Sequence, residues 1–301
     1  MFDSMPQVSG PVGATPQNEA RREWLASLKL DFASRRQRTA LIENTHVGPL
    51  SVQRPFYPEL AQPHRCHVYM LHPPGGLVAG DCIDINLRLQ QHSQTLLTTP
   101  SAGKIYRTDT ASHLQQQRVC ADIEAQACLE WLPQETIVFS GANARIHNRF
   151  QLCDDAKLIA WDIVCLGRRA SGETFDHGRC EQLIEVLRNQ QLVLRERNIW
   201  PGESELMHAP WGMAGNTVAG TMFATTTVER RHLDQWRELL AQEATEETAG
   251  EWGITQKPSI FIARYLGQSA QQCRRGFELL WQHLRPFMIE AEACRPRIWN
   301  T

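Results

Sequence analysis

The chain has 301 residues, and its 42% hydrophobic and 21% charged residues give the balance of an ordinary globular protein. Because 31 basic residues stand against 33 acidic ones, for a formal charge of −2, nothing electrostatic favours binding to nucleic acid or to an anionic membrane. No apolar run approaches the ~20 residues that span a bilayer. The nine cysteines are dispersed without a CxxC pair and no export signal is recognisable, so we expect reduced thiols in a cytoplasmic protein.

The first 19 residues are rich in Pro, Gly, Ser, Gln and Thr and have no hydrophobic periodicity, which predicts a disordered N-terminal arm over 1–19. From residue 20 to residue 301 neither a linker nor an internal repeat interrupts the chain. We therefore expect a single domain over 20–301.

Short apolar and β-branched runs separated by turn residues follow from residue 39 onward. In 83–89, Ile and Leu alternate with polar residues, as in a strand with one buried face, and we expect this strand to pair with 95–99 in a hairpin or meander. The regular spacing predicts a mainly β fold and leaves sandwich, barrel and β-helix open. The expected strands are 39–44, 50–52, 66–71, 83–89, 95–99, 115–120, 128–132, 136–139, 145–152, 157–166, 181–194 and 260–266.

Two segments in the C-terminal part have helical spacing instead. The first is a short amphipathic helix around Leu233, Trp236 and Leu240, and the second lies within 270–285 and is expected to end at Pro286. The apolar face of the second helix can belong to the core or can anchor a partner in a groove, and we favour the core. The side chains of that face are Cys273, Phe277, Leu280, Trp281 and Leu284.

The sequence lacks the motifs of several common catalytic and nucleotide-binding sites. The run Pro-Ser-Ala-Gly-Lys at 100–104 lacks the first glycine of a phosphate-binding loop and has Ile105 where Ser or Thr must meet Mg²⁺. No GxSxG or HExxH motif is present. The only local His/Cys cluster comprises His64, Cys66, His67 and His72, and an extended strand turns its neighbours to opposite faces, so we expect structural roles.

Three acids are the more informative candidates. Asp162 stands in the apolar run 158–166, where a carboxylate needs either an ion-pair partner or a wet cavity. Asp81 follows a Gly-rich loop and can cap a turn, and Glu196 lies between two arginines and can form a surface ion pair. Together these oxygen ligands could hold a divalent ion transiently, although their spacing forms no closed site. The candidate internal partners of Asp162 are Arg168, Arg169 and Arg195.

Several co-linear segments of the chain closely resemble the UreD family of urease accessory proteins, also called UreH. The resemblance runs from about residue 24 to the C-terminus, and it departs from the family pattern at Ala79 and Gly103. Its segments are HVGPLSVQRPFYPE (46–59), HPPGGLVAGD (72–81), LLTTP (96–100), AGKIYR (102–107), EWLPQETIVF (130–139), WDIVCLGRRASGETF (161–175), LRPFM (284–288) and PRIW (296–299).

The resemblance implies a chaperone-like protein rather than an enzyme. Its implied partners are the urease structural subunits and the accessory protein UreF, with the GTPase UreG reached through UreF. It implies a β-helix-like stack of many short strands with two α-helices toward the C-terminal part, and an interior route that carries nickel(II) transiently, with no permanently bound cofactor. Asp81, Asp162 and Glu196 then become candidates for lining that route. The alternative is a β-rich hydrolase that uses Asp162 with Asp81 or Glu196 as an acid and base pair.

Overall fold

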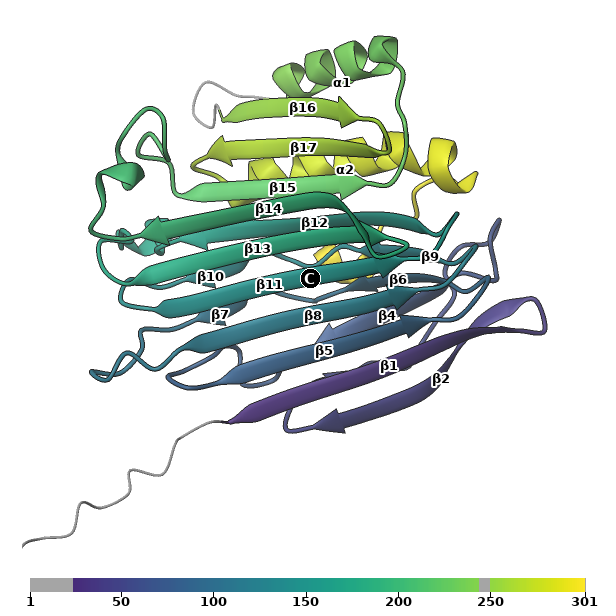
Figure 1. The fold of residues 1–301 in the computed structure, drawn as a ribbon, viewed down its shortest axis with the longest axis horizontal. Helices are drawn as coiled ribbons and strands as arrows, with labels where there is room; N and C mark the ends of the chain where they lie inside the picture. The colour runs from purple at the N-terminus through teal and green to yellow at the C-terminus, as the bar shows by residue number, and fades with distance from the viewer. Residues whose placement is uncertain (1–23, 244–249, 301) are drawn as a thin grey trace, which may run out of the picture.

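The computed structural model describes residues 24–243 and 250–300, so the arm predicted over 1–19 lies outside the described residues. Within them the chain is mostly strand and forms two mixed sheets, neither of which closes into a barrel. Two α-helices lie in the C-terminal part of this described chain (Figure 1). The mainly β fold with two C-terminal helices is therefore confirmed.

Seven strands of the described chain form one sheet, in the order β14-β13-β11-β8-β5-β1-β2. They are β1 (Leu25–Arg35), β2 (Arg38–Val47), β5 (Cys82–Leu89), β8 (Gln115–Ile123), β11 (Asn143–Leu152), β13 (Arg179–Arg188) and β14 (Gln191–Pro201).

The other sheet has ten strands within the described residues, in the order β16-β17-β15-β12-β9-β6-β4-β3, with β10 pairing to β12 and to β7. These strands are β3 (Ser51–Val52), β4 (Cys66–Leu71), β6 (Gln94–Thr98), β7 (Gly103–Ile105), β9 (Cys128–Trp131), β10 (Thr136–Val138), β12 (Lys157–Leu166), β15 (Val218–Ala224), β16 (Glu251–Lys257) and β17 (Ile260–Gly267). Short 3-10 turns occupy Arg169–Ser171, Glu205–Met207 and Arg297–Asn300.

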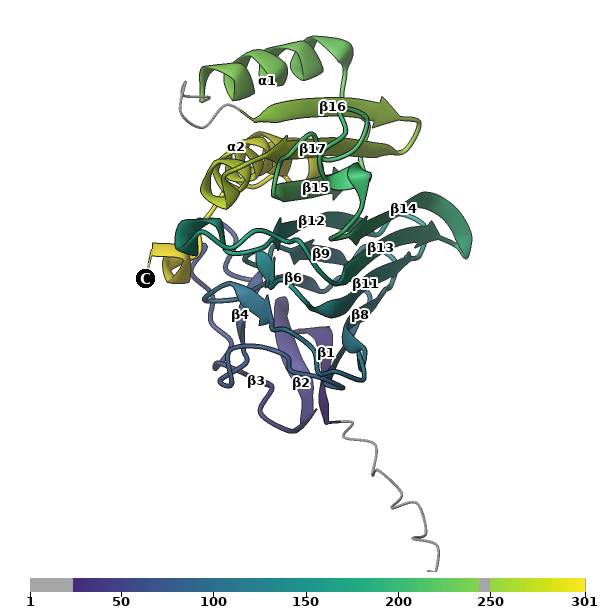
Figure 2. The ribbon, with the colours of Figure 1, turned by 90° about the vertical axis from the view of Figure 1, so that its left-hand side faces the viewer.

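The chain passes back and forth between the two sheets as it advances. Strands β4, β6, β9 and β12 of the ten-stranded sheet alternate along the chain with β5, β8, β11 and β13 of the seven-stranded sheet, and neighbours within each set pair in parallel. Figure 2, which looks roughly along the strands, shows the two walls that this winding builds. The β-helix-like stack is confirmed.

Two expectations about strand pairing are wrong. The strands at 83–89 and 95–99 form no hairpin, because β5 and β6 belong to different sheets and residues 90–93 turn the corner between them. The run at 181–194 is not one strand but parts of β13 and β14, which pair antiparallel. Asn189 and Gln190 join them with φ of 49° and 66°, the backbone that a tight hairpin turn requires.

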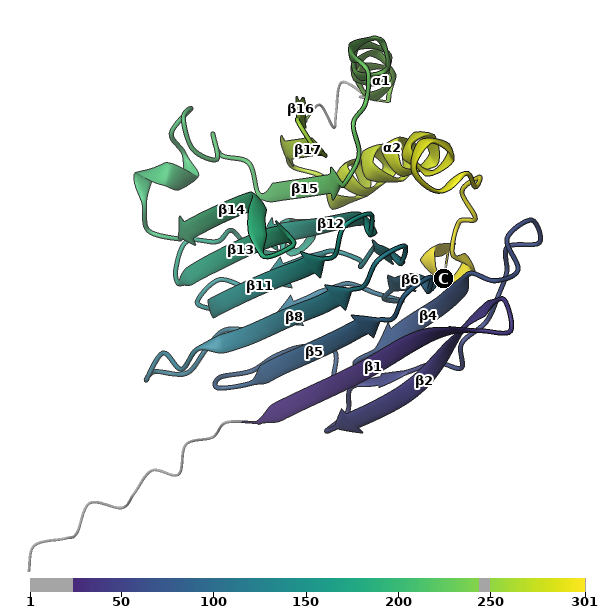
Figure 3. The same ribbon diagram turned by 45° about the vertical axis from the view of Figure 1, so that its right-hand side comes forward.

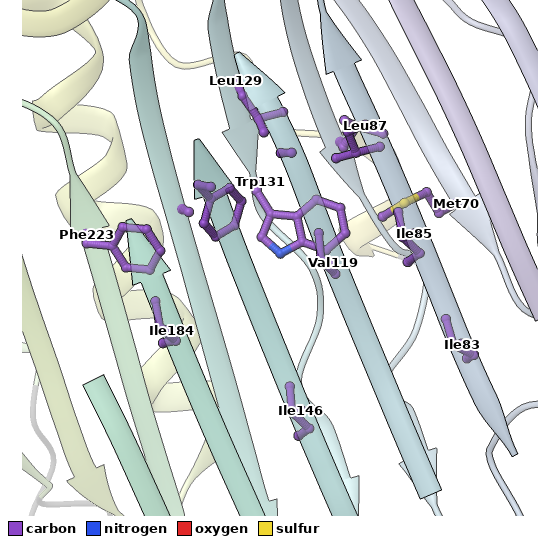
Figure 4. Packing of buried hydrophobic residues seen from close by; sticks show 14 of the residues in the cluster. Met70, Ile83, Ile85, Leu87, Val119, Leu129, Trp131, Ile146, Ile184 and Phe223 are labelled. Carbon is purple, nitrogen blue, oxygen red and sulfur yellow. The ribbon is translucent and has the colours of Figure 1, made fainter. Parts of the chain in front are cut away.

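Apolar side chains from both inner faces fill the space between the sheets (Figure 4). Most strands bury one face, as β8 does with Val119, Ala121 and Ile123. Strand β12 buries both, because Ala160 points between the sheets while Trp161 points to the layer beneath the helices. This double burial explains the unbroken apolar run that surrounds Asp162 in the sequence.

The helices α1 (Arg230–Gln242) and α2 (Ala270–Ile289) lie beside the ten-stranded sheet, at the end formed by β15, β16 and β17 (Figure 3). Phe277, Trp281 and Leu284 of α2 are fully buried, so they are core residues, as expected. Neither helix of the described chain is long and apolar enough to cross a membrane.

The predicted end of α2 at Pro286 is wrong, because the helix continues to Ile289. Pro286 lies within the last turn, where the missing N–H removes one hydrogen bond. The helix ends instead at Glu290, which has a left-handed φ of 53°.

Candidate functional site

A row of polar side chains crosses the inner face of the ten-stranded sheet. Asp162 in β12 is paired with Thr221 in β15, which is paired with Arg264 in β17, so all three lie on the same face of the sheet. Asp162 and Thr221 are each 4% exposed, whereas the side chain of Arg264 is 47% exposed. The row therefore runs from the closed interior of the fold out to solvent.

The facing wall is the inner face of the seven-stranded sheet, and it presents three amides and one acid to this row. Asn148 Nδ2 and Gln182 Nε2 each donate a hydrogen bond of 2.9 Å to Asp162 Oδ2. Asn198 Nδ2 donates to Gln182 Oε1 at 2.8 Å and to Glu196 Oε1 at 3.4 Å. Two amide side chains, Gln182 and Asn198, thus link the interior acid Asp162 to Glu196.

Burial dominates the electrostatics of Asp162. Desolvation of its carboxylate raises its pKa to about 6, and the negative charge of Glu196 acts in the same direction. The hydrogen bonds from Gln182 and Asn148 oppose the rise, because they stabilise the ionised form. Asp162 is therefore a carboxylate held in a low-dielectric interior by neutral partners.

An internal ion pair was one of the two expectations for Asp162, and it is wrong. Within the described chain the side-chain hydrogen bonds of Asp162 come from amides. Two of its three candidate arginines have other partners, since Arg168 bonds to Glu173 and Arg195 lies 3.5 Å from Glu185.

Glu196 lies at the outer end of the row, on β14, the last strand of its sheet. Its Oε1 accepts a hydrogen bond of 2.6 Å from Thr221 Oγ1, and its Oε2 accepts one of 2.9 Å from Arg264 Nε. The expected ion pair is confirmed, although the Glu196 side chain is only 11% exposed. These contacts bridge β14 to β15 and β17 and so join the edge strand of the seven-stranded sheet to the inner face of the ten-stranded sheet.

An open cavity of about 690 Å³ lies outside this junction. Glu196, Asn198 and Thr221 form its polar floor, and Arg264 and Trp211 stand on its rim. Trp211 is 75% exposed, so an aromatic surface borders the opening. We call this cavity the mouth.

Asp81 lies apart from the other two predicted acids. Its Oδ2 accepts a hydrogen bond of 2.8 Å from Val78 N, which confirms the turn cap. The strand register places Asp81 level with Cys180 of β13, three strands away, or about 14 Å at the usual strand spacing. The structure therefore brings Asp162 and Glu196 together and leaves Asp81 elsewhere.

Asp81 adjoins a second cavity, of about 360 Å³, lined by His72, Lys104, Gln117 and other residues of the loops and inner faces. Burial lowers the pKa of His72, and the nearby charge of Asp81 opposes that effect. We call it the loop cavity.

Sequence reasoning missed Asn148, Gln182, Thr221 and Arg264. Thr221 gave no local signal, because β15 is buried on both faces. A signal for Asn148 and Gln182 was present, because each is a polar residue in the inward phase of an alternating strand. Asn148, for example, stands between the buried Ile146 and Phe150. A polar residue in that phase must meet a partner inside the fold.

Within the described residues, no three His, Cys, Asp or Glu side chains gather into a metal site. Two histidines of the local cluster have structural partners, since His67 Nε2 bonds to Glu59 at 2.7 Å and His64 Nε2 bonds to Gln94 at 3.1 Å. Any cation held at the polar row would therefore meet few charged ligands.

Comparison with known proteins places the chain in a family. A family model described as UreD urease accessory protein matches residues 25–300. The urease accessory protein UreD of Saccharophagus degradans is 47% identical over 280 residues, which cover 93% of this chain and 94% of that protein. Proteins of the same name from Hahella chejuensis and Janthinobacterium sp. are 42% and 41% identical, over 93% and 92% of this chain and 91% of each relative. The chain therefore belongs to the UreD family of urease accessory proteins.

Proposed function

We propose that this protein helps to mature urease by passing nickel(II) through its interior to the urease apoprotein. It acts as a chaperone-like component of a cytoplasmic complex, which contacts the urease structural subunits on one side and UreF on the other. UreG is reached through UreF. Nickel is cargo in this scheme and not a resident cofactor.

The observation that carries the proposal is the polar path from the mouth to Asp162. A path for a hydrated cation needs polar groups where the core would otherwise be apolar. Here Thr221 and Glu196 adjoin the mouth, and Gln182 leads inward to Asp162. A single interior carboxylate with amide neighbours favours weak binding, which suits release.

The inward end of the path points toward the loop cavity. Gln117, which lines that cavity, is paired with Ile146 in β11, and Ile146 is paired with Gln182 in β13. Gln117 and Gln182 are therefore two strands apart, about 10 Å at the usual spacing. Ile146, a fully buried apolar residue, lies between them, so we propose that nickel passes the Ile146 side chain to reach the loop cavity near Asp81.

The competing hydrolase function has less support. The family is named for an accessory role rather than a catalytic one. Both oxygens of Glu196 also already accept hydrogen bonds, from Thr221 and Arg264, so neither is free to face a substrate.

Co-expression tests the proposal. The urease subunits and the other accessory proteins are produced with or without this chain, and urease is purified for nickel analysis. Nickel-loaded urease that appears only with the chain, together with co-purification of the chain with urease and UreF, is the expected result. Equal loading without the chain would overturn the proposal.

A matched pair of variants then tests the path. Asp162→Leu should leave the complex assembled and lower the nickel content of urease. Val164→Leu is the control, since Val164 is a fully buried, inward residue two positions along the same strand. Equal nickel contents for the two variants would contradict a role for Asp162.

A further inference from the structure

Of the two polar atoms of the Asn148 amide, only the nitrogen has a hydrogen-bond partner among the described residues. Its Nδ2 donates to Asp162 Oδ2 at 2.9 Å, whereas its Oδ1 is buried and accepts no hydrogen bond from the described residues. The residue is 3% exposed. A buried carbonyl oxygen without a donor costs about 1–3 kcal/mol, so native folds rarely retain one. This oxygen is therefore an unused ligand atom within the polar site.

Gln182 differs from Asn148, because both polar atoms of its amide have hydrogen-bond partners. Its Nε2 makes the same 2.9 Å bond to the same oxygen of Asp162, but its Oε1 accepts a hydrogen bond of 2.8 Å from Asn198. Turning the Gln182 amide would break bonds at both ends. Turning the Asn148 amide would break one bond, and Asp162 Oδ2 would keep the hydrogen bond from Gln182. Asn148 is thus the amide of the pair that can turn at low cost.

A turned Asn148 amide places Oδ1 about where Nδ2 now lies. Two oxygens, one from Asn148 and one from Asp162, would then stand about 2.9 Å apart and repel each other unless a cation joined them. A small octahedral divalent ion holds oxygens at about 2.0–2.1 Å, so adjacent ligands are about 2.9 Å apart. The observed spacing of 2.9 Å matches that octahedral edge.

We propose that Asn148 is a switchable ligand of a divalent-cation site at Asp162. Without the cation, the amide N–H of Asn148 stabilises the carboxylate. With the cation, the amide turns and Asn148 Oδ1 binds beside Asp162, while Gln182 stays fixed by Asn198. A site of one carboxylate and one neutral oxygen carries few ligands, so the ion leaves readily. The identity of the ion as nickel(II) rests on the proposed function.

The test compares two amides that donate to the same atom. Nickel(II) binding to the purified full-length chain is measured by calorimetry for Asn148→Leu and Gln182→Leu, with folding checked by thermal unfolding. Asn148→Leu should weaken binding at least about fivefold, since it removes a ligand. Gln182→Leu should weaken it by less, because that side chain only donates N–H groups to the carboxylate and supplies no ligand atom. Equal losses in the two variants would reduce Asn148 to a hydrogen-bond donor and overturn the inference.

A second variant keeps the test decisive if Asn148→Leu does not fold. Asn148→Asp offers an oxygen without the need to turn and should bind nickel(II) about tenfold more tightly than the wild type. Unchanged or weaker binding would contradict the inference. Because binding is measured on the chain alone, Asn148-dependent binding without any effect on urease loading would reject the proposed function and leave the cation site standing.

Discussion

Glu130 and Arg285 are joined by two hydrogen bonds of 2.9 Å, although 155 residues separate them in the chain. Glu130 lies in β9 and Arg285 in the last part of α2, so the bonds fasten the C-terminal helix to the ten-stranded sheet. Both side chains are fully buried, and Glu130 also pairs with Arg65 at 3.2 Å. A buried ion network thus holds the helical layer in place.

Glu130→Gln should destabilise the protein by about 3–5 kcal/mol, because it leaves the buried guanidinium groups of Arg65 and Arg285 to share the single carboxylate of Glu59. Chemical denaturation measures the loss. The control is Glu124→Gln, which removes an exposed pair with Arg88 of similar length (3.0 Å) and should change the midpoint little. Equal effects would show that the buried network adds no stability.

The same residue predicts a dependence on pH. Burial alone would raise the pKa of Glu130, but the charges of Arg285 and Arg65 outweigh it and lower the pKa to about 2. A lowered acid pKa gives stability that is present above the ordinary value of 4.5 and is lost as pH falls toward 2. Wild-type stability should therefore fall over that window, and Glu130→Gln should flatten the fall.

Gly220 in β15 lies at a close approach of α2 to the sheet. A Cβ there would lie 2.4 Å from Cys273 Sγ and 3.0 Å from the ring of Phe277. Gly220→Ala should destabilise by about 1–3 kcal/mol through overpacking. In β16, Gly253 has no atom within 4 Å of its added Cβ, so Gly253→Ala should be neutral or slightly stabilising. Thermal unfolding of the two variants distinguishes these outcomes.

The mainly β fold could be predicted from the sequence, because alternation such as that of 83–89 reports one buried face directly. The partner of each strand could not. Strands β5 and β6 follow each other in the sequence, yet they belong to different sheets. The local hydrophobic pattern does not indicate which of the two sheets a strand joins.

The candidate site was likewise only partly predictable from the sequence. Asp162 was recognisable because an acid in an apolar run is costly to bury. Its partners Asn148 and Gln182 come from β11 and β13 of the opposite sheet, and their contact depends on how the two walls face each other. Arg264 is farther still in sequence, 68 residues from Glu196, so nothing local indicated that pair.

The guanidinium of Arg264 bonds to the carboxylate of Glu196, which lines the mouth. Arg264 therefore competes with any metal ion for that carboxylate. Arg264→Gln should therefore increase nickel(II) binding by the full-length chain. Arg197→Gln is the matched control, since Arg197 lines the same mouth but pairs with Glu181 at 2.8 Å. Calorimetry should show the increase for the first variant alone, and the further change Glu196→Gln should abolish it. An increase that survives Glu196→Gln would place the added binding at another site.

Asp162→Asn should make the protein more stable at pH 8 while lowering its ability to load urease with nickel. The folded protein raises the pKa of Asp162 from 3.8 to about 6, chiefly by burial. Because the folded state binds this proton more tightly than the unfolded chain does, wild-type stability falls as pH rises from about 4 through 6. The loss above that window is about 3 kcal/mol, and an uncharged asparagine avoids it.

Urea denaturation at pH 4, 6 and 8 measures the difference between Asp162→Asn and the wild type, which should be near zero at pH 4 and greatest at pH 8. Asp84→Asn is the control, because it removes a carboxylate that is partly exposed beside Arg118 instead of one buried among amides. A variant less stable than the wild type at pH 8 would mean that the amides of Asn148 and Gln182 stabilise the ionised carboxylate more than burial penalises it. A gain in stability with a loss of nickel loading would instead indicate that this carboxylate is retained for the cation at the expense of the fold.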